Sequence, residues 1–292
     1  MRLPGGRSAT LSALLAAVAC GSASEGLVEP LCSAPVVSRA EAVADSTNVL
    51  RAFVSGIVQG TDSVVVRFGL GATRDSTTPA FVPVGGSVVA PILGLEAERR
   101  YEAQLIAHNR CGTTASNALT FDTGRLPADL PSYAGGGEVP TPGYLVIGAG
   151  SYGLVLNSAL RVVWYHRFAA GLGLNFQAQP NGRYVVRPPS APGQSGVWIE
   201  IAPTGEVTRT LGCARGLQPR MHDMIAEPGG DYWLLCDETR TMDLSAQGAS
   251  AQSRVSGTSV QHIGAAGELL FDWSPFDHFA VELNILDPVD RN

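Results

Sequence analysis

The chain of 292 residues contains no lysine: all 20 of its basic residues are arginine. Without a side-chain ammonium group it cannot build a Walker phosphate loop, a lysine Schiff base or a Ser-Lys dyad. The 26 acidic residues give a net charge of −6, and no run of basic residues occurs. Nucleic acid is therefore not an expected partner.

Charged residues are scarce, whereas turn-forming residues are abundant. Charged side chains make up 16% of the chain, against roughly 25% in an ordinary soluble domain. The chain holds 34 glycines and 19 prolines, and 45% of its residues are apolar. This composition predicts a folded, loop-rich and all-β protein rather than a disordered one, and the length allows two domains with sizeable cores.

No apolar stretch of the sequence is long enough to span a membrane. Residues 11–19 form a short apolar run that follows two arginines and ends in Ala17-Val18-Ala19, which predicts a signal peptide over residues 1–19. Cys20 comes next, as in a bacterial lipoprotein box, so we expect either a lipid anchor on Cys20 or simple cleavage at the same bond. Both alternatives give an exported protein, either a cell-envelope lipoprotein or a secreted or periplasmic protein. Residues 20–36 would then form a tether.

The five cysteines contain no C-x-x-C pair, so a structural zinc site is not expected, and we expect no metal or other cofactor. If Cys20 carries lipid, four cysteines remain, and an oxidising compartment favours their pairing. Three pairings are possible. We prefer the one that keeps each bond inside one domain, which joins Cys32 to Cys111 and Cys213 to Cys236.

Residues 37–123 contain short apolar runs separated by Gly, Asp and Asn. This pattern predicts seven short strands of a β-sandwich. Leu93-Gly-Leu95, Tyr101 and Leu119-Thr-Phe121 together resemble a fibronectin type III domain. In that family a leucine before a turn and a tyrosine after it pack across one corner of the sandwich. The resemblance implies a fold but no function, since such domains serve as spacers or as binding modules.

A linker rich in Pro and Gly, residues 124–142, leads to a repetitive segment, residues 143–292. Tyr144, Tyr184 and Tyr232 open successive units roughly 40 to 50 residues apart, which is the spacing of β-propeller blades. Residues 239–259 are polar, and we expect them to loop out of the third unit.

The predicted fold class is thus all-β, with a fibronectin type III-like sandwich followed by three blades of an incomplete β-propeller. Propellers typically need four to eight blades. We therefore expect the chain to be a fragment of a longer propeller. Self-association of the chain or a sheet array that stays open are the alternatives.

The segment Gly148-Ala-Gly150-Ser-Tyr-Gly153 matches the G-x-G-x-x-G pattern of dinucleotide-binding proteins. The residues that follow are typical of another strand instead of a helix. No acidic residue occurs between Glu138 and Glu200, so the acidic partner of the ribose is missing. We interpret the segment as a glycine-rich turn. The patterns G-x-S-x-G and H-E-x-x-H of serine hydrolases and zinc proteases are absent from the sequence.

Among the five histidines, His222 is singled out because Asp223 follows it and because the apolar run that begins at Tyr232 comes shortly after. A histidine beside an inner strand of a blade can point toward the axis of a propeller, where such folds bind ligands. A neighbouring carboxylate can orient its imidazole or hold it charged. We therefore predict a site at His222 and Asp223.

This segment resembles the bacterial arylsulfotransferase family, which joins a small N-terminal β-sandwich to a six-bladed propeller. The matching residues are His222, Asp223, Pro228 and Gly230. The usual asparagine of that turn is Gly229 here. A second match, residues 267–279, contains Trp273 and the pair Asp277-His278.

The resemblance implies sulfuryl transfer from an aryl sulfate ester to a phenol through a sulfohistidine intermediate, without a nucleotide donor. His222 matches the family's sulfate-binding histidine, with Asp223 as its orienting group. His278 is a weaker candidate, because its matched position is not that of the nucleophile. The family's nucleophile lies C-terminal to the matched segments, so we expect this chain to be inactive alone.

Two other functions stay open. The chain can be a non-catalytic exported module that binds or adheres to a ligand through the propeller funnel, and in that case no aryl sulfate or phenol is turned over. A quinoprotein-like dehydrogenase is disfavoured, because the calcium-ligand and tryptophan-docking pattern of that class is missing from the sequence.

Overall fold

The computed structural model describes residues 32–133, 143–168, 174–188 and 196–279. These residues form nineteen strands and two short 3-10 helices, η1 (Ser245–Gln247) and η2 (Pro275–Asp277). The expected all-β fold class is confirmed. Within the described ranges, no helix is long and apolar enough to cross a membrane. The expected signal peptide, Cys20 and residues 134–142 of the expected linker lie outside the described residues.

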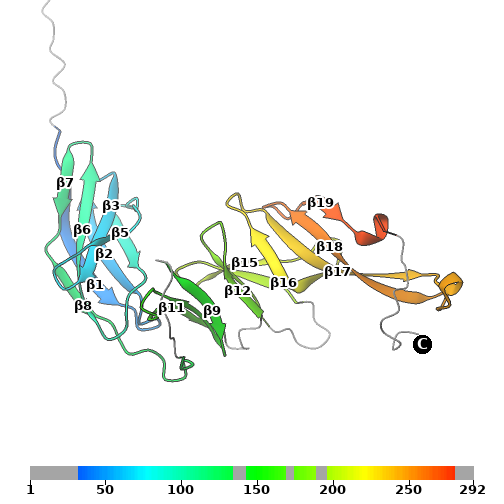
Figure 1. Ribbon diagram of the computed structural model, residues 1–292. Coiled ribbons are helices and arrows are strands. Elements are labelled where there is room, and N and C mark those ends of the chain that lie inside the picture. Colours follow the sequence, from blue (N-terminus) through cyan, green and yellow to red (C-terminus); the bar gives the residue numbers. More distant parts are fainter. Residues whose placement is uncertain (1–31, 134–142, 169–173, 189–195, 280–292) are drawn as a thin grey trace, which may run out of the picture.

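The first eight strands form a two-sheet sandwich (Figure 1). One sheet has the order β1-β2-β5, from β1 (Val36–Ala44), β2 (Ala52–Gln59) and β5 (Ser87–Ile92). The other has the order β4-β3-β6-β7, with β8 also paired to β6. Its strands are β3 (Ser63–Leu70), β4 (Ser76–Thr77), β6 (Arg100–Asn109), β7 (Gly112–Ala115) and β8 (Leu119–Asp122). Alternate residues of β2 and β6 are buried between the sheets, as in a fibronectin type III-like sandwich.

The corner expected from the leucine and the tyrosine is present. Leu95 is fully buried, and the backbone N–H of Glu96 donates to the Tyr101 hydroxyl at 2.8 Å. The Tyr101 ring stacks on Phe121 at a centroid distance of 5.6 Å. A disulfide joins Cys32 to Cys111 with 5.4 Å between their Cα atoms, which confirms the first preferred pairing.

Three antiparallel sheets follow, each with its strands in sequence order (Figure 1). The first sheet contains β9 (Leu145–Ala149), β10 (Tyr152–Leu156) and β11 (Val162–Arg167). The second contains β12 (Leu174–Ala178), β13 (Tyr184–Arg187), β14 (Trp198–Ile201) and β15 (Val207–Leu211). The third contains β16 (Gln218–Ala226), β17 (Tyr232–Met242), β18 (Ser253–Ile263) and β19 (Leu269–Trp273). The opening strand of the second sheet contacts those of the first and third, which is the arrangement of successive propeller blades.

The three sheets pack face to face in series, with one apolar core between the first and second sheets and another between the second and third. Val155 and Trp164 of the first sheet meet Phe176, Val186 and Ile201 of the second. The opposite face of the second sheet meets the third sheet through a core that contains Val185, Trp198, Leu211, Met224 and Leu234. The second sheet is therefore apolar on both faces, because both are buried.

Residues 239–259 project from the third unit as expected, but as a paired hairpin. They extend β17 and β18 into one continuous antiparallel ladder that runs from the pair Tyr232–Ile263 to the pair Met242–Ser253. Figure 1 shows this hairpin projecting beyond the third sheet, with η1 at its tip. A ladder is made by backbone groups, so polar side chains do not prevent it when the flanking strands set the register.

The glycine-rich segment expected to be a turn connects β9 to β10, with Gly150 at φ 59° between the two strands. A Cβ atom on Gly153 would lie 2.8 Å from the Phe176 ring, so this glycine permits the close approach of the first and second sheets. The segment therefore opens no helix and lacks the geometry of a dinucleotide-binding loop.

The second sheet also buries a charge. The Glu200 side chain is 3% exposed and accepts from Arg209 Nη2 at 3.0 Å, Thr208 Oγ1 at 2.7 Å and Asn181 Nδ2 at 2.8 Å. Burial alone raises the pKa of Glu200, but the hydrogen bonds from Arg209, Thr208 and Asn181 outweigh it, so the pKa lies below its ordinary value of 4.5.

We predict that Glu200→Gln lowers the free energy of unfolding at pH 7 by about 2 kcal/mol, because the partly buried guanidinium of Arg209 loses its counter-charge. The stabilisation from the carboxylate is present above the ordinary pKa and is lost as pH falls through the lower folded-state pKa. The difference between the two proteins should therefore shrink in acid. Urea unfolding from pH 7 to pH 3 measures it.

Glu206→Gln is the matched control, since the Glu206 side chain is 65% exposed in a turn of the same sheet. This change should alter stability by no more than about 0.5 kcal/mol. Equal stability of Glu200→Gln and the unchanged protein at pH 7 would contradict the assignment of Glu200 as a buried anion.

Candidate functional site

The predicted site residues His222 and Asp223 lie in a wide bulge of β16, the opening strand of the third sheet. Pro219 pairs with Cys236 and Met224 pairs with Leu234, so residues 220–223 stand opposite the single residue Leu235. A bulge of this kind bends the strand and turns its side chains out of the regular alternation.

Side chains of the second sheet hold the bulge in place by donating to its backbone carbonyl groups. The bonds run from Arg187 Nε to Pro219 O at 3.2 Å, from Trp198 Nε1 to Arg220 O at 2.9 Å, and from Asn175 Nδ2 to Met221 O at 2.7 Å and to His222 O. Asn175 lies in the left-handed region at φ 57°, which asparagine tolerates better than most residues. The bulge is therefore fixed by the neighbouring sheet rather than by its own ladder.

The side chains of His222 and Asp223 themselves have no bonding partner among the described residues. Both residues are exposed, and neither side chain forms a hydrogen bond or an ion pair with any residue that the structure describes. The neighbouring sheet therefore positions the backbone of these two residues, and their side chains project from it into solvent.

An apolar groove of about 260 Å³ lies beside Asp223 on the face of the third sheet that points away from the second. Its walls are Asp223, Met224, Ile225, Trp233, Leu234, Leu235 and Val260. Asp223 is the one charged residue among them. A groove that is apolar apart from one carboxylate suits the ring of an aromatic ligand.

A histidine and an aspartate that sequence reasoning missed support one wall of this groove. The Trp233 ring stacks on His262 at 4.2 Å with 3° between the planes, and His262 Nε2 lies 2.5 Å from Asp231 Oδ2. The apolar run from Tyr232 to Leu235 predicts a strand, but the pairing of Trp233 with His262 depends on a register that the sequence does not disclose.

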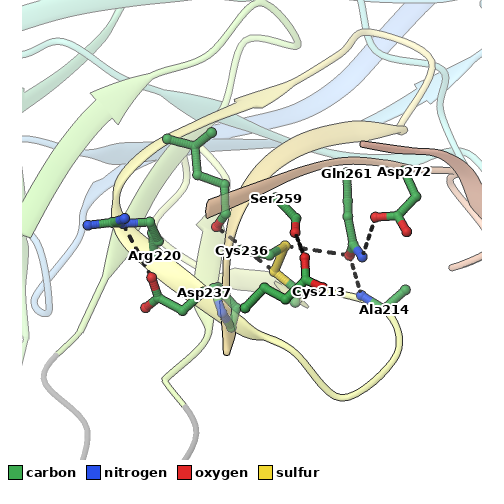
Figure 2. Close-up of a disulfide and its surroundings, with 12 residues drawn as sticks. Cys213, Ala214, Arg220, Cys236, Asp237, Ser259, Gln261 and Asp272 are labelled. Atoms are coloured by element: carbon green, nitrogen blue, oxygen red, sulfur yellow. Dashed lines mark hydrogen bonds and ion pairs between the residues drawn. A yellow bond between two sulfur atoms is a disulfide. The ribbon is translucent and has the colours of Figure 1, made fainter. Parts of the chain in front are cut away.

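The second preferred disulfide ties the third sheet to the segment that follows β15 (Figure 2). Cys213 and Cys236 are joined with 6.1 Å between their Cα atoms, which confirms the second preferred pairing. Around it, Gln261 accepts from Ala214 N–H at 2.7 Å and donates to Asp272 at 3.1 Å. At the foot of the bulge, Arg220 Nε lies 3.4 Å from Asp237 Oδ1.

The structure does not bring His278 into this site. His278 caps η2, is exposed, and stacks on Trp273 at a centroid distance of 5.4 Å. A hydrogen bond from Arg240 holds the pKa of Asp277 below its ordinary value, so this carboxylate is an anion committed to Arg240 rather than to His278. His278 does not line the groove beside Asp223.

Among the described residues, no group of three or more His, Cys, Asp and Glu side chains is arranged to hold a metal ion. The available chemistry of the site is therefore that of one imidazole, one carboxylate and an aromatic wall. An imidazole can bind or transfer an anionic group, and the wall can hold a ring.

Comparisons with known proteins assign no family to this chain. No family model matches the sequence, and no curated protein matches it. One solved structure that it resembles is the FN1-FN3 domains of chicken CNTN1, with 10% identity, a TM-score of 0.22, and coverage of 82% of this chain and 96% of that chain. At that TM-score, nothing about this chain follows from the similarity.

We predict that Asn175→Gly, which keeps the backbone conformation but removes the amide, lowers the free energy of unfolding by about 1 to 2 kcal/mol, because two carbonyls of the bulge lose their donor. Amides that flank the bulge, at Met224 and Cys236, should exchange with solvent faster. Chemical denaturation and hydrogen exchange measure the two effects.

Asn117→Gly serves as the control, because Asn117 is exposed in the sandwich and its side chain makes no hydrogen bond with a described residue. Unchanged exchange at Met224 in the Asn175 variant would show that the bulge does not depend on the second sheet.

Proposed function

We propose that this chain binds aryl sulfate esters at His222 and belongs to an arylsulfotransferase-like system that transfers the sulfuryl group to phenols through a histidine. The observation that supports the proposal is the exposed side chain of His222 on the bulge of β16, one residue before Asp223, which lines the apolar groove. His222 itself is not among the residues that line the groove. The groove would take the aryl ring and the imidazole would face the sulfate.

The chemistry of the site fits an anionic aromatic ligand. A ring N–H of His222 would donate to a sulfate oxygen in a charge-assisted hydrogen bond. Trp233, Leu235 and Val260 offer apolar surface to a ring. The volume of about 260 Å³ lies just below the range of ligand pockets, which starts at about 300 Å³, and leaves room for no more than a single ring.

In the proposed transfer, a histidine nitrogen attacks sulfur, the S–O bond to the aryl group breaks, and the phenolate leaves with the electron pair. The oxygen of the acceptor phenol then attacks the same sulfur, the N–S bond breaks with its electron pair returning to the histidine nitrogen, and the acceptor's proton passes to the departed phenolate. No atom is oxidised or reduced. His222 binds the sulfuryl group in this scheme and is not the attacking residue, so we expect the chain by itself to bind the ester without turnover.

A non-catalytic exported binding module is the second candidate, favoured by the almost wholly apolar lining of the groove. Two disulfides are compatible with export, because such bonds persist in oxidising compartments. We propose in addition that the chain is either a cell-envelope lipoprotein with a lipid on Cys20 or a secreted or periplasmic protein released by cleavage.

We predict that the chain binds 4-nitrophenyl sulfate more tightly than 4-nitrophenol, as measured by calorimetric titration. His222→Ala should weaken binding of the ester about tenfold, since a hydrogen bond to a charged group contributes about 1.5 kcal/mol or more. Binding of the phenol should not change.

The control is His108→Ala, which removes a histidine from β6 of the sandwich. Equal ester affinity in the His222 and His108 variants would refute the proposed role of His222. Tight and equal binding of ester and phenol that is lost in Trp233→Ala would favour the non-catalytic binding module.

A further inference from the structure

The first sheet has two buried faces, although only one of them meets another sheet of the array. Val155, Val163 and Trp164 face the second sheet. The opposite face carries five side chains that are at most 7% exposed: Tyr152, Leu154, Leu156, Val162 and Tyr165. An apolar face of this size needs a partner, because exposed sheet surface of this kind aggregates.

The sandwich and the start of the linker cover that face. Leu50, from the loop between β1 and β2, is 2% exposed and lies in the same core. Val49, Ala97, Leu126 and Leu130 pack around it. Figure 1 shows the first sheet lying at the end of the sandwich from which these segments emerge. The contact therefore has an apolar centre made of residues from both sides.

Hydrogen bonds surround this centre on the side of the β1–β2 loop. Asn48 Nδ2 donates to Tyr165 O at 3.2 Å, and the backbone N–H of Val49 donates to the Tyr165 hydroxyl at 3.3 Å. Arg51 donates to the carbonyl of Thr204 in the turn between β14 and β15. These bonds fix the loop to the first two sheets.

Two more segments cover this face, the loop between β5 and β6 and the segment that follows β8, and a carboxylate of each bonds to the first sheet. Glu96 accepts from Asn157 Nδ2 at 3.3 Å and forms an ion pair with Arg161. Asp129 accepts from the Tyr152 hydroxyl at 2.6 Å and lies 3.1 Å from Arg167 Nε. Residues 124–130 are thus packed against the first sheet, in contrast to a free spacer.

We infer that the sandwich is the terminal cap of the sheet array. In a closed ring of blades, this face of the first sheet would meet the last blade. Here it is occupied by Leu50, Leu126 and Leu130, so a ring cannot close through it without displacing the sandwich. Stacked arrays need such caps to protect their terminal apolar faces. This role gives the sandwich a structural function, and it favours the open sheet array over the closed six-bladed propeller that the resemblance to arylsulfotransferases implies. It does not depend on the proposed ligand.

Hydrogen exchange of the full chain tests the inference. Leu50→Asp places a charge in the shared core, and we expect amides of β10 and β11 to lose at least tenfold in protection. Val89→Asp is the matched control, because Val89 is 62% exposed on the sandwich, and it should leave β10 and β11 unchanged.

Leu50→Asp could also disturb the sandwich itself, so Glu96→Gln is used as a second variant that removes the charge of one interface carboxylate. The tyrosine corner uses the backbone N–H of Glu96, so the side chain can change while the corner stays intact. We expect at least a threefold loss of protection in β10 and β11 with the sandwich strands unaffected. Unchanged protection of β10 and β11 in both variants would overturn the inference and leave the sandwich an independent domain.

Discussion

The packing of apolar side chains between consecutive sheets is the interaction on which the rest of the structure depends. Each of the three sheets is too small to be stable alone, since a sheet of three or four strands needs a partner for its apolar face. The second sheet buries Val186 on one face and Val185 on the other, and so links the first sheet to the third. The sandwich extends the same series by one step through Leu50.

The candidate site is a product of that packing. Trp198 is fully buried in the core between the second and third sheets, yet its indole N–H donates to the carbonyl of Arg220 in the bulge. One side chain therefore joins the core to the backbone that carries His222. The disulfide between Cys213 and Cys236 connects the same two sheets covalently. The site needs no flexible loop, because sheets position the free imidazole and the groove.

Local patterns predicted the fold class, because short apolar runs and turn residues act over a few positions. Both disulfides followed from the preference for bonds inside one domain, and the corner formed by Leu95 and Tyr101 followed from the resemblance to fibronectin type III domains. The long ladder of β17 and β18 was not predicted, because its outer part has polar side chains and lacks the apolar alternation that indicates a strand. The aromatic wall was not predicted either, because Trp233 and His262 meet only through the register of two strands. The packing of Leu126 against the first sheet is a long-range contact, and the composition of a Pro-rich segment does not predict such a contact.

The central claim is that His222 is a free ligand-binding imidazole beside an aryl groove. Proton NMR of the five histidine ring signals, assigned by single His→Ala variants and recorded during addition of 4-nitrophenyl sulfate, tests it most directly. The account predicts the largest shift for the His222 ring, with no movement of His108 in the sandwich. A His222 signal that stays in place while the ester binds would contradict it.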